Sequence, residues 1–220
     1  MGRIPIRWHQ VFDFLMGRSL DSDAQITLSV IRFHRSLSAL FVGGLLALSG
    51  CLLQALLRNP LADSYTLGLS GGGAAGASLA LLFALSPAYI WLPALSVIGA
   101  FSAVTIVVVL SLRSLRSESR SLILTGIMLS LFLGAVSVFM ISLLPVEKNQ
   151  WALSWLMGEF GSSRDDWVLY LFPLCLLPGI YSFMKARALD ILALGDVKAL
   201  SLGVSPRREK MAFIFIATFF

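Results

Sequence analysis

The sequence predicts an all-α fold, a polytopic transmembrane helical bundle with five complete spans and the start of a sixth. Of its 220 residues, 57% are hydrophobic and 13% are charged. Soluble domains are typically about half apolar and about a quarter charged, so this composition is that of a membrane chain. The mean hydropathy of +0.85 agrees with this interpretation. Apolar stretches close to the roughly 20 residues that a spanning helix needs recur along the chain.

Five apolar stretches are expected to cross the membrane. They cover residues 37–57, 66–86, 89–112, 121–144 and 167–184. A sixth begins at residue 211 and covers the last ten residues of the chain. Ten residues are about half of what a span requires. We therefore expect the chain to stop within a helix.

Basic residues in the loops indicate which side of the membrane each loop faces. Residues 58–63, 113–120 and 185–210 are separated from one another by two predicted spans each, so they share one side. The second of these loops reads RSLRSESR, and the third holds six basic residues. Because cytoplasmic loops carry an excess of Lys and Arg, that side is predicted to be cytoplasmic.

The N-terminal segment does not fit this charge rule. Residues 1–36 would lie outside, although they hold five arginines. An additional span upstream would remove the conflict, so we expect the chain to be incomplete at both ends. Cys51 and Cys175 lie within apolar stretches. We interpret both as small hydrophobic residues and not as a disulfide.

The predicted spans lack the groups that would let this chain use an energy source. None of them contains Asp, Glu, Lys, Arg or His, and ion-coupled carriers usually keep such groups at membrane depth. The sequence also has no G-x-x-x-x-G-K-[ST] phosphate loop, so it should not hydrolyse ATP by the usual route. We expect no catalytic residue, no metal site and no cofactor. An ion-driven carrier or channel stays as an alternative.

Small residues recur at helical spacing in two of the spans, 37–57 and 66–86. In the first of these they are Gly43, Gly44, Ala47 and Gly50. Gly68, Gly72 and Gly76 lie four residues apart, so they share one helix face, and such faces let helix backbones approach closely in lipid. Packing is the favoured interpretation, and lining of a pathway is the other. The candidate residues for packing or a pathway are Gln54, Gly68, Ser70, Gly72, Gly76, Thr125, Ser130 and Gly134.

The stretch LDILALGDVKALSLGV, residues 189–204, predicts two short apolar helices in the third cytoplasmic loop. Gly195 and Gly203 divide it, Asp196 can begin the second helix, and Pro206 forbids its continuation. A helix that rests on lipid would have a polar face rich in lysine, but Lys198 is the only basic residue of this stretch. Docking of another protein is therefore favoured over contact with lipid.

Several motifs resemble those of FecCD-type permeases. The longest is IRFHRSLSALFVGGLLALSGCLLQALLRNPLADSYTLGLSGGGAAGAS, at 31–78. In its usual form this signature reads RLPR, an apolar span, RNPLADP and then LG-S-G-G. The segment LDILALGDVKALSLGV is similar to the coupling segment of the family, and SLILTGIMLS and WLMGEF also fit in order. His34 and Ser64 stand where the family has proline, which makes the turn at Ser64 less rigid.

The resemblance implies a transmembrane permease subunit of an ATP-binding-cassette importer for iron–siderophores, haem or vitamin B12 in the bacterial inner membrane. Such a subunit has roughly ten spans of about 20 apolar residues each, and residues 1–220 would form a single permease domain within it. Its implied partners are cytoplasmic ATPase subunits that bind the ATP, a second permease subunit and an outer substrate-binding protein. It is not an enzyme. A truncated permease without function is a further alternative.

The resemblance also assigns roles to individual residues. Arg32 and Arg35 correspond to the arginines that dock the substrate-binding protein. The residues expected to couple to the ATPase are Leu189, Leu192, Gly195, Asp196, Ala199, Leu200, Leu202, Gly203 and Val204.

Overall fold

In the computed structural model, the residues whose structure is described are 8–16, 28, 32–112, 118–158 and 167–220. Every regular element among them is a helix, so the predicted all-α class is confirmed. The chain forms two compact units. One comprises residues 1–44 and 159–174, and the other comprises residues 45–158 and 175–220.

The first unit contains α1 (Trp8–Leu15), the beginning of α3 (His34–Leu57) and the beginning of α8 (Trp167–Met184). The rings of Phe14 and Phe33 meet edge to face, with centroids 6.2 Å apart. This geometry is one of those that aromatic pairs prefer. Both α3 and α8 continue into the second unit.

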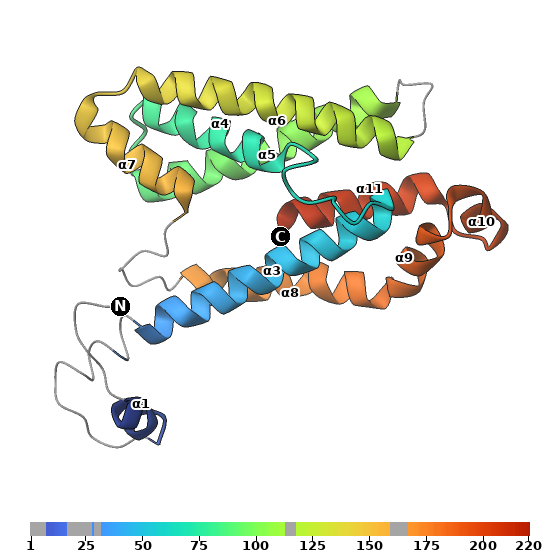
Figure 1. Ribbon diagram of the computed structural model, residues 1–220, viewed down its shortest axis with the longest axis horizontal. Coiled ribbons are helices and arrows are strands. Elements are labelled where there is room, and N and C mark those ends of the chain that lie inside the picture. Colours follow the sequence, from blue (N-terminus) through green and yellow to red (C-terminus); the bar gives the residue numbers. More distant parts are fainter. Residues whose placement is uncertain (1–7, 17–27, 29–31, 113–117, 159–166) are drawn as a thin grey trace. The chain divides into compact units, whose positions relative to one another are not determined.

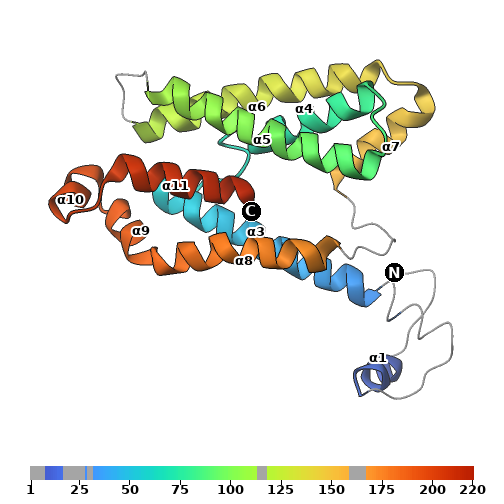
Figure 2. The same cartoon turned by 180° about the vertical axis from the view of Figure 1, so that it is seen from behind.

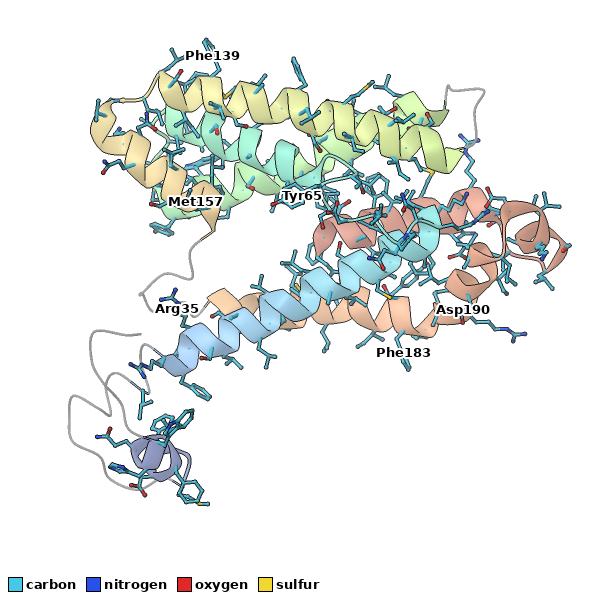
Figure 3. All side chains as sticks on the ribbon, in the orientation of Figure 1. Arg35, Tyr65, Phe139, Met157, Phe183 and Asp190 are labelled. Atoms are coloured by element: carbon cyan, nitrogen blue, oxygen red, sulfur yellow. The ribbon has the colours of Figure 1, made fainter. Side chains whose placement is uncertain are left out.

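The second unit contains a group of three helices that pack side by side, as the views from both sides show (Figures 1 and 2). These are α4 (Leu69–Leu82), α5 (Ala88–Leu112) and α6 (Glu118–Ser142). The remaining helices are α7 (Val146–Met157), α9 (Ala186–Ala193), α10 (Asp196–Ser201) and α11 (Pro206–Phe219). Phe139 on α6 points away from the three-helix group (Figure 3) and is exposed, as suits a helix face in contact with lipid.

All five predicted spans are helical, but only some of these helices reach spanning length. Three described helices are long and apolar enough to cross a membrane, at His34–Leu57, Ala88–Ser111 and Ser121–Ser142. The other two predicted spans correspond to shorter apolar helices, at Leu69–Leu82 and Pro173–Met184. The first of these is short because a hydrogen-bonded turn occupies residues 63–66 before it.

The predicted sixth span begins earlier than residue 211. Helix α11 starts at Pro206, whose fixed φ suits the first position of a helix. The first turns of α11 are therefore polar and include Lys210, and the apolar part follows them.

One large core joins the C-terminal half of α3 to α5 and α11. Leu53, Val104 and Phe213 lie at its centre with no exposed surface. Ser49 Oγ also donates a 2.8 Å hydrogen bond to the Ala217 carbonyl within this packing. The core and this hydrogen bond therefore connect α11 to α3. A smaller core joins α4, α5, α6 and α7 around Leu92 and Ile141.

Candidate functional site

The segment 185–210 forms the two short helices that the sequence predicts. Helix α9 ends at Ala193 and α10 runs from Asp196 to Ser201. Gly195 between them has φ +118°, and Gly203 after α10 has φ +79°. Residues with a Cβ rarely adopt these angles, which explains the glycines that interrupt the apolar pattern.

Exposed apolar residues lie on α10 and directly after α9 and α10. Leu194, Val197, Leu200 and Leu202 are 59%, 83%, 64% and 58% exposed, respectively. We call these four residues the outer loop face. Leu194 was not among the residues predicted to couple to a partner, and neither was Val197. The spacing of three between Val197 and Leu200 places the two on one helix face, so helical periodicity could have identified Val197.

The opposite side of the two helices belongs to this chain's own core. Leu192 and Ala199 have no exposed surface and join the core cluster around α3 and α11. Leu189 and Val204 are half-buried and pack against the same cluster. These four side chains anchor the helices to the core, and their predicted part in coupling to the ATPase stays a prediction.

An ionic cluster, which we call the Asp196 clamp, connects α10 to two other segments. Oδ1 of Asp196 accepts a hydrogen bond from Nη2 of Arg58, directly after α3. Its second oxygen, Oδ2, lies 2.6 Å from Nζ of Lys210 in α11. A further ion pair joins Lys185 Nζ, just before α9, to Glu209 Oε1 in α11 at 3.1 Å. The sequence predicted Asp196 at a helix start but none of its partners.

The turn between α3 and α4 is held by its own side chains. Thr66 N–H donates to Asp63 Oδ1 at 2.9 Å, and Thr66 Oγ1 donates to the Asp63 carbonyl at 2.6 Å. Asn59 Oδ1 accepts from the Leu61 N–H at 3.0 Å. Such side-chain bonds are what Asx and related turns supply. These bonds hold the turn in place around Ser64, the position at which FecCD-type permeases have a proline.

The glycines of α4 lie where its backbone touches α5 and α6. A Cβ added to Gly72 would lie 2.5 Å from the Gly99 carbonyl oxygen of α5, and one added to Gly71 would lie 2.9 Å from the Ser130 carbonyl oxygen of α6. A Cβ added to Gly76 would lie even closer to the backbone, at 2.0 Å from the Leu95 carbonyl oxygen. These contacts favour the packing interpretation of Gly72 and Gly76.

The other candidates for packing or a pathway lie in different surroundings. Gly68 is buried and is the N-cap residue before α4, with φ +86°. Ser130 Oγ donates a 2.6 Å hydrogen bond to the Tyr65 carbonyl and so ties α6 to the turn before α4. Gln54 is exposed, Ser70 and Thr125 are half-buried, and a Cβ on Gly134 would meet open space. A pathway role for these residues stays a prediction.

Arg32 and Arg35 lie in the first unit, at the N-terminal end of α3. Arg35 is exposed in the first turn of α3 (Figure 3), and Arg32 is half-buried. Their docking role stays a prediction. No group of three or more His, Cys, Asp or Glu side chains that could hold a metal ion occurs among the described residues.

Comparison with known proteins gives consistent matches. The model of the FecCD transport family matches residues 1–220. The chain is 36% identical over 219 residues to the uncharacterized ABC transporter permease protein YvrB of Bacillus subtilis, covering 94% of this chain and 59% of YvrB. It is 33% identical over 218 residues to the Fe(3+) dicitrate transport system permease protein FecD of Escherichia coli, covering 99% of this chain and 66% of FecD.

Two further similarities concern a vitamin transporter and a solved structure. The vitamin B12 import system permease protein BtuC of Klebsiella pneumoniae is 33% identical over 190 residues, covering 86% of this chain and 56% of BtuC. A metal-chelate type ABC transporter, solved in an inward-facing conformation, superposes with a TM-score of 0.79 at 30% identity, covering 96% of this chain and 69% of that chain. The chain thus spans 56% to 66% of the length of these three curated relatives.

Proposed function

The chain belongs to the FecCD transport family, and from this we propose that it serves in the inner membrane as a permease subunit of an ATP-binding-cassette importer. The match of the family model to all of residues 1–220 is the observation that carries the proposal. Relatives are named for Fe(3+) dicitrate and vitamin B12. We accordingly propose an iron–siderophore type of chelate, haem or cobalamin as the substrate.

The outer loop face supports a partner on the cytoplasmic side. Two of its four exposed apolar side chains lie on α10, and the other two directly follow α9 and α10. A cluster of exposed apolar residues typically marks a site of interaction. Interface cores are poor in charge, and this face fits that rule. We propose that an ATPase subunit binds here, hydrolyses the ATP and moves α9 and α10. The complete transporter would hold a second permease subunit and an outer binding protein as well.

Uptake by the assembled transporter tests this proposal. The protein, reconstituted in proteoliposomes with its ATPase and its substrate-binding protein, should accumulate ferric citrate or cobalamin only when ATP is hydrolysed. An ionophore that collapses ion gradients should leave this uptake unchanged. Uptake that needs no ATP and stops with the ionophore would instead support an ion-coupled carrier, and no uptake under any condition would support a non-functional chain.

Charge reversal at the beginning of α3 should weaken docking of the substrate-binding protein. Arg32→Glu with Arg35→Glu replaces two positive charges by two negative ones, and acidic residues on a partner would then be repelled. We expect the dissociation constant to rise about tenfold or more at low salt, and to rise less at high salt because ions screen exposed charges. Binding measured by surface plasmon resonance checks this. Unchanged affinity at low salt would assign both arginines to the membrane interface alone.

A further inference from the structure

We propose that Asp196 is a positioning residue for coupling: the Asp196 clamp makes α10 move together with the end of α3 and the beginning of α11. This inference rests on the proposed function, because it concerns how motion from the ATPase would reach the transmembrane helices. It assigns a task to a carboxylate that is not one of the four residues of the outer loop face.

The Asp196 carboxylate binds two cations from different parts of the chain. Asp196 is the first residue of α10, and its two carboxylate oxygens bind different segments, Arg58 with Oδ1 and Lys210 with Oδ2 at 2.6 Å. Arg58 follows the last residue of α3 directly, and Lys210 lies in the first turns of α11. The Asp196 side chain thus joins α10 to two other segments. Arg58 lies 138 residues before Asp196 along the chain, and Lys210 lies 14 residues after it.

The burial of the partners indicates that the clamp is structured and not a chance surface contact. The Lys210 side chain is only 7% exposed, whereas those of Arg58 and Asp196 are 37% and 40% exposed. A buried ammonium group strongly favours a carboxylate beside it. The Asp196 carboxylate is therefore held from the interior by Lys210, and it holds Arg58 on the outside.

A second ion pair fixes the other end of the two-helix segment. Lys185 lies just before α9 and binds Glu209, the residue next to Lys210 in α11, at 3.1 Å. The Glu209 side chain is 14% exposed. Helices as short as α9 and α10 are not stable alone, so their orientation depends on these ties and on the buried Leu192 and Ala199. Hydrogen bonds to charged groups are directional, so a carboxylate shared by two cations adds a fixed geometry to these apolar contacts.

The test is Asp196→Asn in the assembled transporter, which keeps the size of the side chain and removes its charge. We expect ATPase binding and ATP hydrolysis to persist, while substrate taken up per ATP hydrolysed falls at least about fivefold, the lower end of typical coupling between sites. Asp196→Glu keeps the charge and should restore most of the ratio. Asp190→Asn is the matched control, since Asp190 is exposed on α9 and has no ion pair among the described residues.

A double-mutant cycle separates the clamp from a general effect on structure. Arg58→Gln should lower the ratio on its own, and adding it to Asp196→Asn should lower the ratio little further, because both changes break the same pair. An unchanged ratio in Asp196→Asn, or fully additive effects in the cycle, would overturn the proposal. If Asp196→Asn does not accumulate in the membrane, Arg58→Gln alone decides, with the same expected fall. Failure of the unaltered protein to bind an ATPase would instead overturn the proposed function.

Discussion

Replacing Gly76 by alanine should separate α4 from α5 and strongly destabilise the protein. The added methyl group would collide with the backbone of Leu95, and a Cβ added one turn earlier, at Gly72, would lie only 2.5 Å from the Gly99 carbonyl oxygen. Backbone atoms cannot move aside as a flexible side chain can, so two helices must shift. Overpacking typically costs about 1–3 kcal/mol, and we expect this site to lie at the upper end because the obstacle is a helix backbone.

Thermal unfolding in detergent measures this effect. Gly76→Ala should lower the midpoint by several degrees, or prevent accumulation of folded protein. Gly134→Ala is the matched control: it adds the same methyl group to α6, where nothing lies within 4 Å of the new atom. Because alanine favours helix over glycine by about 1 kcal/mol, the control should be neutral or stabilising. Equal stability of the two variants would mean that α4 and α5 are not in backbone contact.

The helices could be predicted from the sequence because the apolar composition and residue spacing that indicate a helix lie within one continuous stretch of the chain. The predicted packing role of Gly72 and Gly76 follows from their spacing of four, which places small residues on one face. The partners of this face, Gly99 and Leu95 of α5, could not be predicted. Helices that are apolar all round carry no sequence signal for which side meets which neighbour.

Residues 189–204 show the same limit within two short helices. Gly195 and Gly203 predicted these two helices because a positive φ requires glycine at their ends. The side of α10 that Ala199 occupies could not be predicted, since six residues are less than two turns and both sides carry apolar residues. The tie between Arg58 and Asp196 joins residues 138 positions apart, and only the folded chain brings them together.

Aspartate substitutions at neighbouring positions of α10 should therefore act in different ways: one should disturb folding, and the other should prevent binding of the ATPase. Leu200 is 64% exposed on the outer loop face, whereas Ala199 has no exposed surface. Ala199→Asp would place a carboxylate in the core, which costs several kcal/mol without a partner. We expect this variant to fold poorly or to lose α10 from its place. It would stop transport for a reason that is unrelated to docking.

Leu200→Asp should leave the fold intact and remove the ATPase. An added charge at the centre of an apolar interface loses its water on binding, and hot-spot changes of 2 kcal/mol or more are typical at such positions. At 1.4 kcal/mol for each tenfold, affinity should fall about 30-fold or more, as measured by co-purification and by titration of the ATPase in nanodiscs. Val197→Asp, at an 83% exposed position, should act alike.

Ser205→Asp is the control for the added charge. Ser205 is exposed at the N-cap of α11, outside the outer loop face, and aspartate is as suitable an N-cap as serine. This variant should bind the ATPase like the unaltered protein and should melt at the same temperature. If Leu200→Asp and Val197→Asp also bind normally while both remain folded, then the outer loop face contacts something other than the ATPase, and the proposed route of coupling through α9 and α10 is wrong.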